Sequence, residues 1–431
     1  MTYDAAVAYL YSLQKHGIKL GLETIGTLVA RLGFPHRRYR TLHIAGTNGK
    51  GSTAAMAAAI LQAAGYRVGL YTSPHLVEFR ERIRVNGEMI GESEVARLAD
   101  RMKEVCEPDL SPTFFECTTA VAFQYFADVE VDVAVLEVGL GGRFDATNVV
   151  APLACAITTI ALDHQEYLGT TLGSIAFEKA GIIKPNVPVV IGRIAGEARQ
   201  VIEEAAGSRS APLGCLGQDF HVIGERPAQF SYVGRGRRLD DLWCPLEGSH
   251  QVDNAACALA LLEAAGSGGF NTSEEAIRKG LSRVMWEGRL EVVDRRPTVI
   301  LDGAHNPAAA AAVADYLRSF RASNQSSRVI LVLGMMRDKN HRGFAAPLKD
   351  LVDDVIFTQA ELPRSATVEE LQTELKDIWP YCRASGMVSD ALRLAKRLAG
   401  PDDLVCVTGS LMLIGDLKGL LRGRRLSPLR G

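Results

Sequence analysis

Residues 46–52 read Gly-Thr-Asn-Gly-Lys-Gly-Ser, and this loop indicates the fold of the chain more strongly than any other segment. An apolar run at 42–45 precedes it and is typical of a buried strand. An alanine-rich stretch at 53–64 follows, with high helix propensity and no proline. A second strand is expected at 67–71. Strand, glycine-rich turn, helix and strand form the βαβ unit that places a phosphate at a helix N-terminus.

The residue types in this loop suit a bound phosphate. Its three glycines allow the backbone to close tightly around an anion. Lys50 supplies a positive charge, and the hydroxyl of Ser52 can face a phosphate or a metal. The spacing differs from the common pattern G-x-x-x-x-G-K-[ST], because two residues separate Gly46 from Gly49 and Gly51 follows Lys50. A solvated turn is the alternative, which the flanking strand and helix disfavour.

Composition sets limits on the class of protein. The 431 residues are 47% hydrophobic and 23% charged, which allows two or three domains with large cores. A net charge of −2 gives no basic footprint for nucleic acid or an anionic membrane. The eight cysteines form no CxxC pair or Cys/His cluster. This pattern is typical of reduced thiols in a protein of a reducing compartment. Because a signal peptide and a membrane-spanning run are not expected either, the sequence predicts a soluble cytoplasmic protein.

The order of the predicted elements indicates an α/β fold on a doubly wound, mostly parallel sheet. In the first part of the chain we expect a helical segment at 4–32, which is interrupted near 17–21. Further helices are expected at 92–106, 116–127, 173–180, 251–265 and 272–284. Further strands are expected at 132–138, 155–160 and 187–191. The glycine- and arginine-rich stretch 207–248 predicts a small antiparallel patch.

A second α/β series begins near residue 289. It is expected to contain strands at 299–301, 329–333, 354–358 and 404–407. The helices expected between them lie at 307–320, 343–351, 367–376 and 389–399. This series is ~140 residues long, a usual size for a domain. We therefore expect a P-loop domain at 1–287, which includes the antiparallel patch, and a smaller α/β domain at 288–431.

Polar residues lie near the ends of three predicted strands of the first domain: Glu137 lies within the run 132–138, and Ser73 and His164 follow the other two. Because the functional edge of an open α/β sheet is at the carboxyl ends of its strands, these residues should share a rim with Lys50. A buried carboxylate is costly unless it is paired or bound to a metal. A hydroxyl, a carboxylate and an imidazole can hold Mg²⁺ against a triphosphate, although imidazole suits Mn²⁺ better. A Ser-Pro turn and a structural histidine are the alternatives.

Three other segments carry weaker signals. The turn Gly139–Gly142 superficially resembles a dinucleotide fingerprint, but Phe144 occupies the place of its last glycine. Lys179 ends a predicted helix among apolar residues, where a neutral amine can react with CO₂ to form a carbamate, although a lysine favoured by the helix dipole is the simpler interpretation. Asp302 can bind ribose hydroxyls or cap a helix, and Arg289 can clamp a phosphate.

Taken together, these segments resemble the Mur-ligase superfamily, and specifically the folylpolyglutamate synthase/dihydrofolate synthase family. The resemblance runs from about residue 8 to 415. Besides the loop at 46–52, it rests on the segments Leu20–Glu23, Thr72–Leu76, Arg80–Ile83, Leu136–Arg143, Asp145–Asn148, Leu162–His164, Glu178–Ile182, Asp302–Pro307, Asp338–Lys339 and Thr408–Ser410.

The resemblance implies roles for the matching positions. ATP would be held by Thr47, Asn48, Gly49, Lys50, Gly51 and Ser52, with further contacts from Asn254, Arg289 and Asp302. The metal ligands would be Ser73, Glu137 and His164, and Lys179 would be a carbamylated lysine. The pterin pocket would be lined by Thr113, Phe114, Phe115 and Glu116 together with Phe144, Asp145 and Ala146. The incoming glutamate would be handled by His305, Arg82 and Ser410, and the catalytic residues would be Lys50, Lys179 and His305.

The implied activity is an ATP-dependent ligation in a monomer that uses two Mg²⁺ ions, or Mn²⁺. A carboxylate is a poor acyl donor, so ATP first converts it to an acyl phosphate, which the amine of L-glutamate then attacks. The expected products are dihydrofolate, made from dihydropteroate, and reduced folates with longer glutamate tails. Lys19, before Leu20 in the substrate-binding segment, departs from members that carry an acid there. A monofunctional folylpolyglutamate synthase is therefore the first alternative.

Three further functions are alternatives. A ligase acting on peptidoglycan precursors should carry a UDP-binding domain before the nucleotide loop, and the loop begins at residue 46. A nucleotide-dependent switch without ligation would bind ATP but release no phosphate when given pteroate and glutamate. An NAD-dependent oxidoreductase would depend on the weak signal at Gly139–Gly142.

Overall fold

The computed structural model describes residues 1–17, 21–106, 109–226 and 229–423. It divides the chain into two compact units, each made of three segments. The first contains residues 1–74, 79–245 and 251–284, and the second contains 75–78, 246–250 and 285–431. The assignment of a P-loop domain to 1–287 and a second domain to 288–431 stays our proposal.

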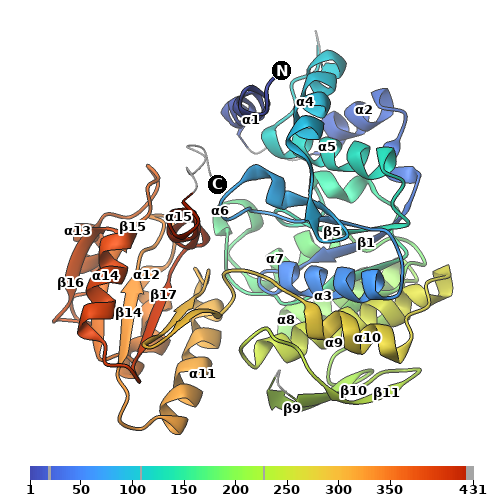
Figure 1. The fold of residues 1–431 in the computed structure, drawn as a ribbon. Coiled ribbons are helices and arrows are strands. Elements are labelled where there is room, and N and C mark those ends of the chain that lie inside the picture. The colour runs from blue at the N-terminus through green and yellow to red at the C-terminus, as the bar shows by residue number, and fades with distance from the viewer. Residues whose placement is uncertain (18–20, 107–108, 227–228, 424–431) are drawn as a thin grey trace. The chain divides into compact units, whose positions relative to one another are not determined.

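The first unit is built on an eight-stranded sheet with the order β4-β3-β2-β5-β1-β6-β7-β8 (Figure 1). Strands β2, β5, β1, β6, β7 and β8 are parallel to one another, whereas β3 and β4 form an antiparallel edge. Their bounds are β1 Arg40–Ala45, β2 Val68–Tyr71, β3 Ile83–Val85, β4 Glu88–Met89, β5 Val133–Glu137, β6 Ala154–Ile157, β7 Val189–Ile191 and β8 Leu213–Cys215. The expected doubly wound, mostly parallel α/β fold is confirmed.

Helices cover both faces of this sheet, as buried strands require. In Figure 1, α1, α2, α4 and α5 lie on one face and α3, α9 and α10 on the other. The helices of this unit are α1 Tyr3–Ser12, α2 Glu23–Arg31, α3 Lys50–Ala63, α4 Glu92–Cys106, α5 Phe114–Asp128, α6 Gln165–Leu168, α7 Leu172–Ala180, α8 Gly196–Ser208, α9 His250–Ala265 and α10 Glu274–Arg283. Of these, α6 and α8 were not predicted.

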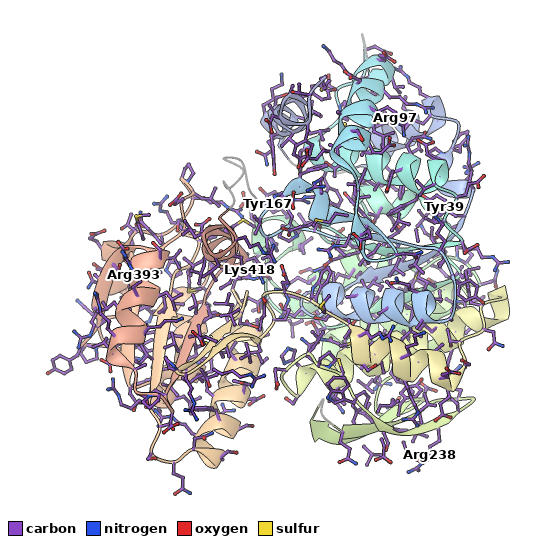
Figure 2. The ribbon with its side chains drawn as sticks, in the orientation of Figure 1. Tyr39, Arg97, Tyr167, Arg238, Arg393 and Lys418 are labelled. Carbon is purple, nitrogen blue, oxygen red and sulfur yellow. The ribbon has the colours of Figure 1, made fainter. Side chains whose placement is uncertain are left out.

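The predicted antiparallel patch is confirmed as a three-stranded sheet of β9 His221–Arg226, β10 Gln229–Val233 and β11 Arg238–Leu242. Arg238 on β11 is exposed and pairs with Asp240 at 3.0 Å (Figure 2). The predicted bounds, 207–248, were too wide. They included β8, which instead extends the large sheet in parallel beside β7.

The second unit contains a six-stranded sheet with the order β12-β13-β17-β14-β15-β16. Its strands are β12 Glu291–Arg295, β13 Thr298–Leu301, β14 Val329–Leu333, β15 Asp354–Gln359, β16 Arg383–Met387 and β17 Leu404–Thr408. Its helices are α11 Pro307–Ser323, α12 His341–Ala345, α13 Val368–Leu375, α14 Val388–Leu398 and α15 Leu411–Leu421. The helix expected at 343–351 is divided, because residues 346–351 continue α12 as a 3₁₀ helix.

Two short segments from earlier in the sequence complete this second unit. Leu76 and Val77 are buried in a cluster that includes Val299 on β13 and Ile414 on α15. Lys418 on α15 is also buried, and its Nζ lies 2.8 Å from a carboxylate oxygen of Glu291 (Figure 2). A buried lysine needs such a partner, since an unpaired charge in the interior is costly.

No helix within the described ranges is long and apolar enough to cross a membrane. All eight cysteines have free thiols.

Candidate active site

The nucleotide loop is held in shape by the segment that follows β6. Thr47 N donates to Thr159 O at 2.8 Å, and Asn48 N donates to the hydroxyl of Thr159 at 2.9 Å. The hydroxyl of Thr158 donates to Asn48 O at 2.6 Å. These bonds fix the loop before any ligand binds. Sequence reasoning missed both threonines, although a Thr-Thr pair directly after an apolar strand was a usable signal.

Glycine is required at the last loop position before helix α3. Gly49 caps this helix with a φ of 87°, in the left-handed region that favours glycine. A Cβ there would lie 2.3 Å from Oδ1 of Asn254, so only glycine allows this side chain to approach the loop. Asn254 comes from α9, about two hundred residues later in the chain, and its amide also donates to Gln251 at 2.9 Å. The structure thus brings Asn254 to the loop, as the family resemblance implies.

Lys50 begins α3 and folds back over the loop. Its Nζ donates to Gly46 O at 3.1 Å and to Thr47 O at 3.2 Å. Ser52 is buried in the first turn of the same 14-residue helix. The free N–H groups at the start of a helix attract anions, and a lysine ammonium adds to that field.

Ser73 and Glu137 lie together at the carboxyl edge of the sheet. Ser73 follows strand β2, and Glu137 is the last residue of strand β5. These two strands are parallel neighbours in the sheet. Ser73 N donates to a carboxylate oxygen of Glu137 at 3.2 Å, and Glu137 is buried. Since β1 is the other neighbour of β5, this pair and the nucleotide loop come from adjacent strand ends.

His164 follows β6, the next strand along the same edge. It has a φ of 49°, an uncommon value for a residue other than glycine, and its backbone N donates to Asp163 at 2.9 Å. Its imidazole is 45% exposed, and Nε2 lies 3.9 Å from a carboxylate oxygen of Asp163. Within the described ranges, no group of three or more His, Cys, Asp or Glu side chains is arranged to hold a metal. Our proposed set needs only one carboxylate and one imidazole besides the Ser73 hydroxyl.

Lys179 is buried near the end of α7, and its Nζ donates to Gly46 O at 3.0 Å. The same carbonyl accepts from Lys50, so two ammonium groups meet at one loop atom. Burial, and then the positive charge of Lys50, lowers the pKa of Lys179 to about 7. A large fraction of this amine is therefore neutral near pH 7, as a reaction with CO₂ requires.

Replacement of Lys179 should stabilise the fold. The unfolded lysine has a pKa near 10.5 and the folded one about 7, so between these values the unfolded chain binds more protons. Stability of the wild type therefore increases with pH across this window. We expect Lys179→Met to raise the free energy of unfolding at pH 7 by about 2–4 kcal/mol. Urea unfolding without metal, in CO₂-depleted buffer, at pH 7 and pH 10 should show a gain that shrinks at pH 10.

The aromatic segment predicted to line a pterin pocket lies at the start of α5. Glu116 completes a capping box, in which its carboxylate accepts from Thr113 N at 2.7 Å. Phe114 stacks on Tyr11 with ring centroids 5.1 Å apart, and the buried Arg82 lies 5.2 Å over the same phenylalanine ring. Glu116 thus shapes this helix start, while Phe114 and Arg82 pack together beside it.

Phe115 links this segment to the glycine turn after β5. A Cβ at Gly139 would lie 2.4 Å from the Phe115 ring, so the bare backbone allows the ring to approach. In the same turn region, Asp145 caps the 3₁₀ helix Ala146–Val149, and Gly139 N donates to its carboxylate at 3.0 Å. Phe144 is half-buried, and its ring lies 4.2 Å from the guanidinium of Arg143. The structure therefore brings together both segments that the resemblance assigned to the pterin.

The second unit gathers its own polar residues at the carboxyl ends of β13 and β17. Asp302 is buried and accepts from Leu290 N and Ala304 N, each at 2.8 Å. It therefore fixes the backbone directly after Arg289 and the turn that follows β13. The Arg289 side chain donates to Gly288 O at 2.9 Å.

His305 and Ser410 follow these same two neighbouring strands. Nδ1 of His305 lies 2.9 Å from Gly303 O. Ser410 caps α15 by accepting from Met412 N at 3.1 Å. Lys19 and Leu20, the remaining predicted substrate contacts, lie outside the described residues.

Family models and relatives identify the family of this chain. Residues 44–262 match the Mur ligase middle domain, and residues 288–411 match the Mur ligase glutamate ligase domain. The chain is 38% identical to the dihydrofolate synthase/folylpolyglutamate synthase of Bacillus subtilis, over 97% of this chain and 99% of that protein. The chain belongs to the dihydrofolate synthase/folylpolyglutamate synthase family of Mur ligases.

Solved structures of this family have the same fold. Escherichia coli FolC in complex with DHPP and ADP has a TM-score of 0.89 and 36% identity, and 98% of each chain is covered. The bifunctional folylpolyglutamate synthase/dihydrofolate synthase of Yersinia pestis, complexed with AMPPNP and a Mn ion, has a TM-score of 0.88 and 35% identity, with 98% of each chain covered.

Proposed function

We propose that this chain is an ATP-dependent carboxylate–amine ligase that joins L-glutamate to dihydropteroate, forming dihydrofolate, and to the glutamate tail of reduced folates. The observation that carries this proposal is the meeting of Lys50 and Lys179 at the Gly46 carbonyl, directly after strand β1, which is the neighbour of the strand that ends in Glu137. This arrangement suits an enzyme that gathers a triphosphate and an acid at one sheet edge.

The residues proposed as metal ligands fit a divalent cation. The Ser73 hydroxyl and the Glu137 carboxylate are hard oxygen donors of the kind that Mg²⁺ prefers. The imidazole of His164 is more usual on Mn²⁺, and the Yersinia pestis relative was crystallised with that ion. We infer that Ser73, Glu137 and His164 would hold a divalent ion here and that two ions take part. When bound, the ion neutralises charge on the phosphates.

The chain's own residues can carry the first half-reaction. The acid of the pterin substrate attacks the γ-phosphorus of ATP and forms an acyl phosphate, with ADP as the leaving group. Negative charge spreads over the transferring phosphoryl oxygens, where the Lys50 ammonium and the first N–H groups of α3 stabilise it. Asn254 beside Gly49, and Arg289 and Asp302 in the second unit, are proposed as further ATP contacts.

The second half-reaction forms the amide. The neutral amine of L-glutamate attacks the acyl carbon, a tetrahedral adduct forms, and inorganic phosphate leaves. We propose that His305, Ser410 and Arg82 orient the glutamate. His305 also carries an imidazole able to take the proton that the amine loses. Water must be excluded, because it hydrolyses acyl phosphates.

The pterin is proposed to bind against the aromatic start of α5, at Thr113–Glu116, and the segment Phe144–Ala146. The half-buried Phe114 and Phe115 can stack on a flat heterocycle. We also infer that Lys179 becomes carbamylated, which turns a cation beside Lys50 into an anion that can assist the metal. A monomeric state and a cytoplasmic location complete the proposal.

A phosphate-release assay tests this function directly. The full chain is incubated with ATP, Mg²⁺ and L-glutamate, with either dihydropteroate or tetrahydrofolate as the acid. We expect phosphate release with both acids, dependent on glutamate, and product masses that increase by one glutamyl residue. Release with tetrahydrofolate alone would make the enzyme monofunctional. ATP binding without release under either condition would leave a nucleotide switch as the function.

A further inference from the structure

A buried chain of hydrogen bonds runs from β1 to the turn that follows β5. His43 on β1 is fully buried, and its Nε2 lies 2.7 Å from the hydroxyl of Thr147. That hydroxyl donates to Oδ1 of Asp145, which also accepts from Thr147 N at 3.0 Å. The other carboxylate oxygen of Asp145 accepts from Gly139 N and Leu140 N, each at 3.0 Å. Four donors thus hold one carboxylate in a single orientation.

The chemistry of these groups fixes the direction of each bond. The Thr147 hydroxyl has one hydrogen, and the Asp145 carboxylate takes it. His43 must therefore donate from Nε2, which leaves Nδ1 without a hydrogen. Nδ1 is indeed buried with no hydrogen-bond partner among the described residues, a place where a bare nitrogen costs less than an unpaired N–H. Burial lowers the pKa of His43 to about 3, so the imidazole is neutral.

His43 connects these hydrogen bonds to the middle of the large sheet. His43 pairs with Leu136 on β5 and with Cys155 on β6, at the centre of the sheet. Paired residues on adjacent strands point to the same face, and Leu136 packs in the cluster formed with α4 and α5. His43 therefore supports the sheet face on which the proposed pterin segments lie, whereas Thr158 and Thr159 make the bonds that hold the nucleotide loop.

The inference that follows rests on the proposed function and adds two residues to its pterin site. We propose that His43 and Thr147 are positioning residues for the pterin site: they orient the Asp145 carboxylate and, through it, the glycine turn against which Phe115 packs. Neither residue touches the substrate. Thr158 and Thr159 hold the nucleotide loop through separate bonds. Loss of the hydrogen bonds that link His43, Thr147 and Asp145 therefore weakens pterin binding and leaves nucleotide binding intact.

The test compares two replacements at one position. Thr147→Val removes the hydroxyl at nearly constant volume, whereas Thr147→Ser keeps it. With the full chain, the phosphate-release assay should show a KM for dihydropteroate about tenfold or more higher in Thr147→Val, because a buried carboxylate loses a donor. Thr147→Ser should stay within about threefold of the wild type. The Kd for ADP, measured by calorimetry, should change less than about twofold in both variants.

Thr41→Val is the matched control. Thr41 is buried on the same strand as His43, and its hydroxyl has no partner within the described part of the chain, so this change removes a methyl-sized polar group without breaking a bond. Its KM should equal that of the wild type, and its melting temperature should be equal or higher, because a buried hydroxyl without a partner is costly. In a double-mutant cycle, His43→Leu combined with Thr147→Val should cost little more than Thr147→Val alone, as expected for groups that act as one unit.

Two results overturn the inference. The first is an unchanged KM for the pterin acid in Thr147→Val. The second is an equal loss of pterin and nucleotide binding together with a lowered melting temperature. That result would mean that these hydrogen bonds only stabilise the fold. If the wild type uses only tetrahydrofolate, the same comparison is made with that acid, which also carries a pteridine ring. A wild type inactive with both acids contradicts the proposed function itself, and the inference fails with it.

Discussion

Lys50→Ala should reduce kcat in the phosphate-release assay by about 10²–10³-fold, because the transferring phosphoryl group loses a preorganised positive charge. The fold should survive. Lys50 is half-buried, and the loop keeps other bonds: Gly46 O still accepts from Lys179, and Thr47 N remains bonded to Thr159 O. The melting temperature should therefore change by no more than a few degrees.

Lys103→Ala is the control for this change. Lys103 lies exposed on α4, within the same unit, so its removal deletes a charge of the same type without touching the loop. Its turnover should equal that of the wild type. Near-normal turnover in Lys50→Ala, together with a normal Kd for ADP, would show that residues 46–52 do not form the phosphate site.

Glu137→Gln should have the second large effect. The amide is isosteric with the carboxylate but supplies no negative charge, so kcat should fall by at least about 10²-fold and the affinity for Mn²⁺ by at least about tenfold. Free Mn²⁺ can be counted by electron paramagnetic resonance during titration of the protein in the presence of an ATP analogue. Since Glu137 is buried at a strand end, its neutralisation should not lower the melting temperature.

The exposed Glu104 on α4 offers a matched Glu104→Gln control, which should bind Mn²⁺ as the wild type does. If Glu137→Gln bound the ion normally, Glu137 could not be a metal ligand. A loss of activity would then come from the hydrogen bonds of this carboxylate, such as the one from Ser73 N.

The elements that sequence predicted best are those with a complete local signal. The strand before the loop, the glycines within it and the alanine-rich helix after it each indicate the same βαβ unit, and the structure has β1, α3 and β2 there. Parallel strands buried on both faces, such as β14, read as unbroken apolar runs and were also found.

The elements that were missed lack such a signal. Helix α15 is buried over most of its circumference, so it shows no polar stripe to mark a helical period. Strand β8 is three residues long and gains its place only from pairing with β7, which is a contact that no local pattern encodes. Strand β16 is largely exposed and has no apolar alternation.

The candidate site divides in the same way. Lys50, Ser73 and Glu137 stand at the ends of recognisable strands, so topology alone predicts that they share an edge. Asn254 lies inside an apolar helix and could be assigned only through the family resemblance. His43 looked like one more residue of a buried strand, because its partner Thr147 is more than a hundred residues away in the chain.

The interrupted make-up of the second unit bears on how this protein can be dissected. A fragment starting at Met285 would contain the whole six-stranded sheet but would lack Leu76 and Val77, which fill part of its interior. The hole left behind would weaken that fragment, since vacated apolar volume is costly. Truncation at a single site therefore cannot yield either half in its native form, and permuted or grafted versions must carry the four-residue insert at 75–78 with them.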